Sequence, residues 1–135
     1  MSPNASRPDP DRSSVEGLLR ELYAARMGGE LDRLCALFTP DAALKISGSS
    51  DGKPIAIAAR GAAEVRSWLG VLVKTFRLSR QEILSMVIEG PRAAVHWRAS
   101  IHSRITGAAV QTELVDMFEV KEGRIATYVE LFVPS

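Results

Sequence analysis

The second half of the chain constrains the fold most, because turn signals divide it into long segments of strand-forming residues. The signals are Glu-Gly-Pro-Arg at residues 89–92, Thr-Gly at 106–107 and Lys-Glu-Gly at 121–123. The segments between them are rich in Val, Ile and aromatic side chains, which favour strands over helices. From Phe76 to the end, the sequence therefore predicts a meander of long antiparallel strands.

Apolar residues in the first half recur at helical intervals instead. Residues 13–16 have capping-box spacing, and an apolar stripe follows until two glycines at 28 and 29 end the run. A second, short helix is predicted to end before Pro40, and a third begins after Gly61. Between them, residues 41–46 are predicted as a short strand and residues 47–54 as a loop. The order α-α-β-α-β-β-β-β describes an α+β domain, with three N-terminal helices packed on one face of a curved antiparallel sheet.

Length and composition favour one domain with one core, since the chain has 135 residues of which 46% are hydrophobic. Residues 1–12 have little apolar surface to bury and are expected to form a flexible tail, with the domain at residues 13–135. The formal net charge of +1, without a basic run, argues against nucleic-acid binding. One cysteine, no secretory h-region and no apolar run of ~20 residues predict a cytoplasmic protein without a membrane span.

One carboxylate, Asp116, lies in the apolar segment VDMFEV, and strand alternation puts it on the same side as Leu114 and Phe118. Its neighbours on the next strand depend on the turn. A three-residue turn with only Gly123 left-handed is cheaper than a two-residue turn with a glutamate at positive φ. This turn pairs Asp116 with Tyr128 and Leu114 with Glu130, so two carboxylates and a phenol share one apolar surface.

An inward-facing carboxylate loses hydration, so the pKa of Asp116 is expected to rise unless a cation or hydrogen bonds compensate. A carboxyl that stays protonated near neutral pH can donate a hydrogen bond to a substrate oxygen or act as a general acid. The alternative is that Asp116 and Glu130 are solvated, because a register slip of one residue exchanges the two faces.

The segment 93–103 separates into an apolar and a polar face. The apolar face carries Val95, Trp97, Ala99 and Ile101 and is expected to lie beneath the helices; the polar face carries His96, Arg98, Ser100 and His102. The two histidines are roughly 20 Å apart at ~3.3 Å per residue, too far to share a metal ion. The polar face is therefore predicted to be a solvated sheet surface or a dimer interface.

Three stretches together resemble the nuclear-transport-factor-2-like superfamily, which includes ketosteroid isomerases and SnoaL-like polyketide cyclases. They are YAARMGGELDRLCALFTPDAAL, RGAAEVRSWL and VDMFEVKEGRIATYVELF, and the resemblance extends over about residues 14–133. It implies a cone-shaped, cystatin-like half-barrel with a pocket between sheet and helices, and a homodimer formed through the sheet.

The resemblance also implies roles for individual residues. Asp116 matches the position of the oxyanion-stabilising acid of ketosteroid isomerases, and Trp68, Trp97 and Phe132 match pocket-lining positions. The isomerase general base corresponds to Ile46 and its first-helix tyrosine to Leu22, whereas Tyr23 is expected to point about 100° away. Isomerisation of steroids by that mechanism is therefore not expected. Arg26, one turn after Leu22, either reaches the pocket and pairs with Asp116 or is solvated at the helix end.

Three functions remain open: an enzyme of isomerase, cyclase or hydrolase type, a non-catalytic ligand-binding module, and a structural dimer whose pocket is filled by its own side chains. In the first, the catalytic residues are Asp116, Tyr128 and Glu130, and neither a metal nor an organic cofactor is needed. The expected ligand is a small apolar or polycyclic molecule. The predicted ligand-binding residues are Leu22, Tyr23, Arg26, Ile46, Trp68, Trp97, Ala99, Phe118 and Phe132.

Overall fold

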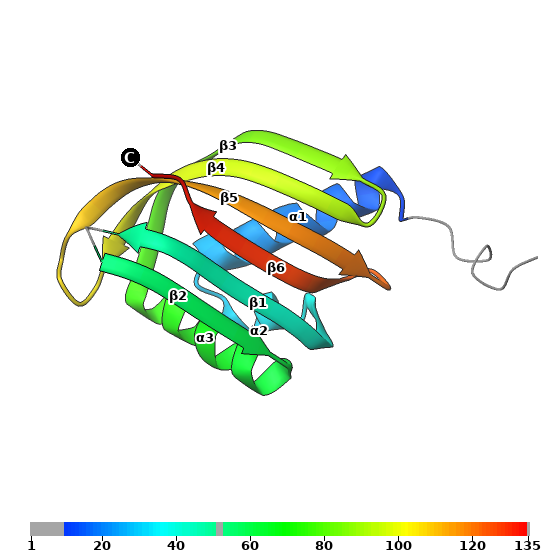
Figure 1. The fold of residues 1–135 in the computed structure, drawn as a ribbon, viewed down its shortest axis with the longest axis horizontal. Coiled ribbons are helices and arrows are strands. Elements are labelled where there is room, and N and C mark those ends of the chain that lie inside the picture. The colour runs from blue at the N-terminus through cyan, green and yellow to red at the C-terminus, as the bar shows by residue number, and fades with distance from the viewer. Residues whose placement is uncertain (1–9, 51–52, 135) are drawn as a thin grey trace, which may run out of the picture.

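The computed structural model describes residues 10–50 and 53–134, which form three helices and a six-stranded sheet. Figure 1 shows the helices on one side of the curved sheet, while none of them covers its other side. The elements are α1 (Arg12–Met27), α2 (Leu31–Cys35), β1 (Phe38–Ser50), β2 (Lys53–Arg60), α3 (Ala62–Thr75), β3 (Phe76–Glu89), β4 (Arg92–Ser103), β5 (Ala109–Lys121) and β6 (Arg124–Phe132).

The strands lie in the order β2-β1-β6-β5-β4-β3. The C-terminal meander is confirmed, since β3, β4, β5 and β6 pair antiparallel in sequence order. The sheet is mostly antiparallel, as expected, with one parallel pair formed by β1 and β6. The parallel pairing arises because the last strand returns to lie beside the first, and it brings Ile46 directly opposite Glu130.

The loop predicted at residues 47–54 is wrong. β1 continues to Ser50 and β2 begins at Lys53, and their antiparallel ladder pairs residues 43–50 with residues 53–60; residues 51–52 of the predicted loop lie outside the described residues. Gly48 suggested a loop, but its position is set by packing: a Cβ there would lie 2.5 Å from Cβ of Phe132. The small residue thus permits a close approach within a strand.

The helix ends also differ from the prediction. α1 begins at Arg12 after Asp11, and the predicted capping box does not form, because Ser13 Oγ donates to Asp11 Oδ2 at 2.5 Å instead. α2 ends at Cys35, and Pro40 lies inside β1, where the pairing with β6 shifts in register. Residues 1–9, most of the predicted tail, lie outside the described residues.

The turn between β5 and β6 has two residues, so the predicted three-residue turn is wrong. Glu122 and Gly123 have φ of 53° and 76°, and positive φ at both positions matches the twist of the flanking strands. A register shift follows at once: Val120 pairs with Ile125, but Glu119 pairs with Thr127. This bulge moves the register by one more residue.

The two departures together shift the register by two residues. The predicted pairings of Asp116 with Tyr128 and of Leu114 with Glu130 are therefore wrong, since Asp116 pairs with Glu130 and Leu114 with Phe132. The predicted faces are retained, because side chains alternate with a period of two.

The core fills the space between the helices and the concave side of the sheet. In β4, Val95, Trp97 and Ala99 are buried as predicted. On the other side of the sheet, Arg98 forms an ion pair with Glu82, and His96 Nε2 lies 3.1 Å from Glu113 Oε1. Within the described part of the chain, no helix is long and apolar enough to cross a membrane. Fully buried side chains of the core include Leu19, Leu22, Leu34, Leu44, Leu69, Leu114 and Ile125.

Candidate functional site

Asp116 lies in the centre of β5, on the face beneath α1, and its exposed fraction is 0%. All its hydrogen bonds are made by one oxygen. Oδ2 accepts from the Tyr23 hydroxyl at 2.6 Å and from Trp97 Nε1 at 2.7 Å, and the Tyr128 hydroxyl lies 3.1 Å away. Oδ1 is equally buried and has no hydrogen-bond partner among the described residues. The donors come from α1, β4 and β6, so three elements fix the position of this carboxyl.

Glu130 is paired with Arg26, a residue in the last turn of α1. Arg26 Nη2 donates to Glu130 Oε1 at 3.0 Å, and Nη1 donates to Oε2, so the ion pair is bidentate. Only 8% of Arg26 and 1% of Glu130 are exposed. The guanidinium also lies 5.4 Å from the ring centroid of Trp97, a cation–π distance.

Tyr128 connects the two carboxyls. Its hydroxyl accepts a hydrogen bond from Arg26 Nη1 at 2.6 Å and lies 2.7 Å from Glu130 Oε2, in addition to its contact with Asp116. A hydroxyl has one proton, so Tyr128 donates to one carboxyl at a time. We call the six connected residues the polar cluster: Tyr23, Arg26, Trp97, Asp116, Tyr128 and Glu130.

The two carboxyls of the polar cluster have opposite pKa shifts. Burial, and then the neighbouring charge of Glu130, raise the pKa of Asp116 well above its ordinary value. Burial also acts to raise the pKa of Glu130, but the charge of Arg26 and its hydrogen bonds outweigh burial and hold that pKa below its ordinary value. One cation therefore neutralises one carboxylate, whose charged form is favoured, while burial and the neighbouring negative charge favour the protonated form of the other carboxyl.

A cavity of about 200 Å³ lies between α3 and the sheet, next to the polar cluster. Arg26 and Glu130 are the two charged residues in its wall, and Asp116 is behind them rather than in the wall. The remaining wall is apolar and consists of Ile46, Ile55, Ile57, Val71, Leu72, Phe76, Leu78, Ile101 and Phe132. An apolar molecule in this cavity would meet charge and hydrogen-bonding groups at the Arg26–Glu130 pair alone.

The structure divides the predicted site residues into three groups. Arg26, Ile46, Glu130 and Phe132 line the cavity. A second group surrounds Asp116 instead: Tyr23, Trp97 and Tyr128 bond to it, and Phe118 stacks on Tyr128 with ring centroids 4.7 Å apart. Leu22 and Ala99 are buried in the core, and Trp68 is partly exposed on α3; none of these three lines this cavity.

Two expectations about α1 need correction. Tyr23 does not point away from the site, because α1 buries a wide face in the concave sheet and both Leu22 and Tyr23 are in the core. A tyrosine partner of the acid is therefore present. Arg26 is buried rather than solvated, and it pairs with Glu130 instead of Asp116.

Sequence reasoning missed the cavity residues on β2 and β3. Ile55 and Ile57 belong to β2, which was not predicted and begins within the loop expected at residues 47–54. Leu78 is the third residue of β3. Their signal was the alternation of isoleucine and alanine at residues 55–58, which has the period of a strand.

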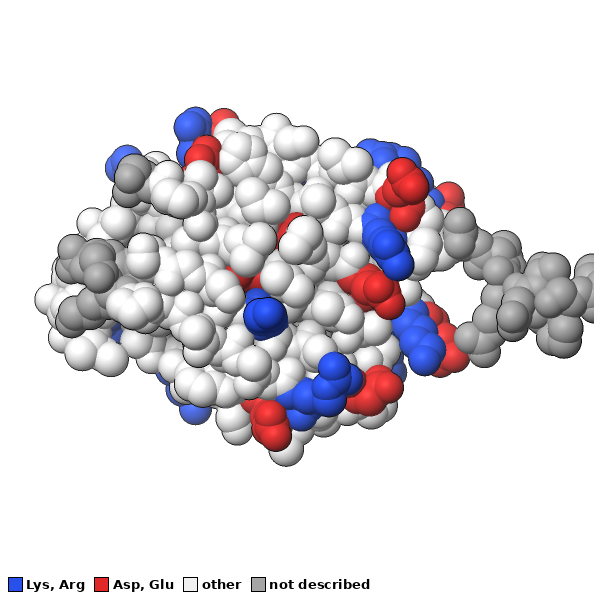
Figure 2. All heavy atoms as spheres, in the orientation of Figure 1, with Lys and Arg blue, Asp and Glu red and all other residues white. Residues whose placement is uncertain are grey.

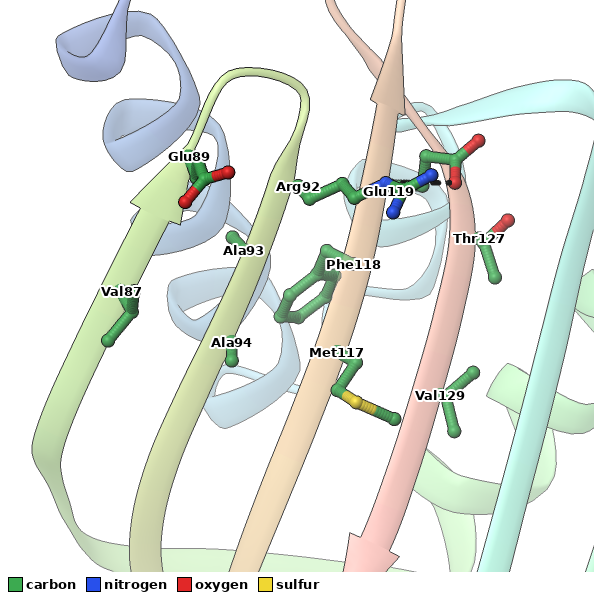
Figure 3. A pocket seen from close by; sticks show the side chains of 10 residues that line it. All are labelled: Val87, Glu89, Arg92, Ala93, Ala94, Met117, Phe118, Glu119, Thr127 and Val129. Carbon is green, nitrogen blue, oxygen red and sulfur yellow. Dashed lines mark ion pairs between the residues drawn. The ribbon is translucent and has the colours of Figure 1, made fainter.

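A second, shallower hollow of about 600 Å³ lies on the open face of the sheet. Figure 3 shows Val87, Ala94, Met117 and Val129, from four adjacent strands, side by side in this hollow. Val87 and Met117 are 61% and 43% exposed, which is unusual for large apolar side chains. Figure 2 shows that mostly uncharged residues make up this face; most of the charged residues lie towards its edges, and a few lie near its middle.

The fold and the cavity define a class of α+β proteins in which helices close the concave side of a strongly curved sheet around a small apolar space. The chain belongs to the SnoaL-like domain family, whose model matches residues 19–128. No curated protein matches the sequence.

Solved structures share the nuclear-transport-factor-2-like fold. A proposed isomerase from Bacillus subtilis has a TM-score of 0.77 and 17% identity, over 90% of this chain and 88% of that chain. A nuclear-transport-factor-2-like protein from Burkholderia xenovorans has a TM-score of 0.76 and 20% identity, over 91% and 92%. A protein of ketosteroid-isomerase-like fold from Catenulispora acidiphila, in complex with trimethylamine, has a TM-score of 0.70 and 12% identity, over 84% and 82%. At these identities the likeness establishes the fold alone.

Proposed function

We propose that this protein binds a small apolar molecule in the cavity between α3 and the sheet and acts on it by acid–base chemistry of the isomerase type. One observation carries the proposal. The single charged part of an otherwise apolar cavity wall, the Arg26–Glu130 pair, is hydrogen-bonded through Tyr128 to a second carboxyl, Asp116, that keeps its proton. Such a pair of carboxyls with opposed pKa shifts is the usual arrangement for an acid and a base in one site.

The proposed roles follow from the contacts. Glu130 accepts a proton from a ligand carbon next to a carbonyl group, and Arg26 stabilises the oxygen on which negative charge develops. Glu130 then returns this proton to a different ligand carbon, so it ends the cycle as the carboxylate it was at the start. Asp116 keeps its proton throughout and is connected to Glu130 by hydrogen bonds through the Tyr128 hydroxyl. The isomerisation therefore consumes no protons and leaves both carboxyls in their starting states.

A second function is also supported by one observation. Both oxygens of Glu130 are occupied by Arg26, and the resulting low pKa makes Glu130 a weak base. The same cavity then holds a ligand without converting it, and the polar cluster only orients the bound molecule. This is the binding-module alternative.

Hydrogen–deuterium exchange distinguishes the two functions. Cyclohexanone fits the cavity in size, and exchange of its α-hydrogens in D₂O, followed by proton NMR, reports proton removal next to a carbonyl. The proposal predicts exchange above the buffer rate with the wild type, and loss of exchange in Glu130→Gln and Asp116→Asn. The exposed Glu119→Gln is the matched control and should exchange like the wild type. Binding of cyclohexanone without exchange would support the binding module instead.

The assembly and the location of the protein remain part of the proposal. We expect a homodimer formed through the open face of the sheet, because Val87 and Met117 are exposed there. The cytoplasmic location expected from the single cysteine is unchanged by the fold.

A further inference from the structure

The volume of the cavity limits the size of its ligand. A cavity of roughly 150 Å³ holds one benzene molecule, about 25 Å³ for each of its carbon atoms. At the same packing, a cavity of about 200 Å³ holds about eight non-hydrogen atoms. This is one small ring with a substituent, or a short branched chain. A polycyclic molecule exceeds this volume and does not fit within the cavity unless wall side chains move.

The charges of the polar cluster limit the charge of the ligand. Arg26 and Glu130 neutralise each other, so the cavity wall has no net charge to offer. A ligand carboxylate beside the Arg26 guanidinium would also lie close to the Glu130 carboxylate, and a ligand ammonium group beside Glu130 would also lie close to Arg26, because the two side chains are in contact. Either ion would lose its hydration in an apolar cavity and gain a like-charge neighbour. A neutral ligand avoids both costs.

The hydrogen-bonding groups select the polar atom of the ligand. Both Glu130 oxygens already accept hydrogen bonds from Arg26, and Oε2 also lies within hydrogen-bond distance of Tyr128. The guanidinium has five N–H groups, and the three hydrogen bonds to Tyr128 and Glu130 use three of them. The wall thus favours a ligand oxygen that accepts a hydrogen bond over one that must donate.

We infer that the cavity selects a neutral molecule of about eight non-hydrogen atoms with one hydrogen-bond-accepting oxygen, such as a monocyclic ketone. The inference rests on the proposed function, since it takes this cavity to be the ligand site. It deepens that proposal by excluding polycyclic, anionic and cationic ligands.

The test uses the full chain and a series of probes with matched rings. Binding of cyclohexanone, cyclohexanecarboxylate, cyclohexylammonium and the bicyclic ketone 2-decalone is measured at pH 7 by calorimetry. Methyl NMR shifts of Ile46 and Ile57 show whether each probe enters the cavity. We expect cyclohexanone to bind, the two ions to bind at least roughly tenfold more weakly, and 2-decalone not to perturb the isoleucine methyls.

Two variants make the test independent of a single ligand series. Glu130→Gln leaves Arg26 without its counter-charge, so this variant should bind cyclohexanecarboxylate more tightly than cyclohexanone. Ile57→Ala enlarges the cavity and should admit 2-decalone. Circular dichroism checks that both variants fold; if either does not, the wild-type series decides alone.

Each outcome bears on one of the two proposals. Wild-type binding of either ion, or of 2-decalone, as tight as that of cyclohexanone would overturn the inference and leave the proposed function intact. Absence of binding of all four probes, with the isoleucine methyls unperturbed, would overturn both.

Discussion

Asp116 shows what alternation along a strand can and cannot establish. The sequence placed it correctly on the inner face with Tyr128 and Glu130, although the turn was wrong, because a two-residue turn and a bulge change the register by two residues in all. The other hydrogen-bond partners of Asp116 could not be predicted from the sequence. Tyr23 and Trp97 lie 93 and 19 residues away, and only the packing of α1 into the sheet brings Tyr23 to Oδ2.

The first prediction concerns stability against pH. The pKa of Asp116 is higher in the folded than in the unfolded chain, so between these values the folded state binds more protons and its stability falls as pH rises. Asp116→Asn removes this dependence. From about pH 4 upwards, the free energy of unfolding of Asp116→Asn minus that of the wild type should increase by up to about 1.4 kcal/mol per pH unit. The increase should stop above the pKa of Asp116 in the folded state. Urea unfolding at a series of pH values measures the difference, with the exposed Asp41→Asn as control, and a pH-independent difference would contradict the prediction.

The second prediction concerns the buried ion pair. Arg26→Met leaves Glu130 as a buried acid without its cation and should lower the free energy of unfolding by about 3–5 kcal/mol. The double variant Arg26→Met, Glu130→Met replaces both charges by apolar groups and should recover most of that loss. Urea unfolding of the two single variants and the double variant gives the coupling energy. Additive losses would show that the two charges act independently.

At the scale of elements, the sequence predicted those with a strong period and missed those with a mixed signal. α1, α3 and the strands of the meander β3 to β6 have long apolar repeats, and all were predicted; the five-residue α2 was predicted from its short apolar stripe before Pro40. β2 was missed because serine, glycine and alanine around residues 47–58 resemble a loop in composition. The cavity could not be predicted either, because the space between α3 and the sheet depends on tertiary packing, and two of its isoleucines lie on β2.

The third prediction tests why β1 contains a glycine. Gly48→Ala places a Cβ against Phe132 and also strains the backbone at φ 149°, so it should lower the free energy of unfolding by about 1–3 kcal/mol. Adding Phe132→Gly should make the Gly48→Ala change cheaper, because glycine lacks both the Cβ and the ring that the new Cβ would meet. Gly17→Ala in α1 is the matched control, with no atom within 4 Å of its new Cβ, and should stabilise by about 0.5–1 kcal/mol. An equal cost of Gly48→Ala with and without Phe132 would refute the packing explanation.

At the scale of the whole molecule, the two sides of the sheet differ in what they contain. The concave side with its helices holds the polar cluster and the cavity. The open side presents a hollow that no described helix covers, with exposed apolar side chains such as Val87 and Met117 beside the charged Glu89, Arg92 and Glu119. The α+β class and the SnoaL-like family follow from the sequence because the order of elements and the C-terminal segment are characteristic. The state of assembly does not follow from one chain.

The fourth prediction is that the open face joins two copies of the chain. Sedimentation equilibrium of the wild type should give twice the chain mass of 14.7 kDa, and Met117→Glu should give the mass of one chain, because it places a charge in the apolar hollow. Ile105→Glu is the control, since Ile105 is exposed in the β4–β5 connection outside the hollow. A monomeric wild type would contradict the proposal.

The central claim is that Asp116 is protonated and Glu130 ionised in the same buried cluster at neutral pH. Carbon-13 NMR of the two carboxyl groups over a pH series tests it most directly. We expect the Asp116 carboxyl carbon to keep the chemical shift of a protonated acid at pH 7, while Glu130 has the shift of a carboxylate. Titration of Asp116 near ~4, the value of a solvated aspartate, would contradict the claim and remove the acid from the proposed chemistry.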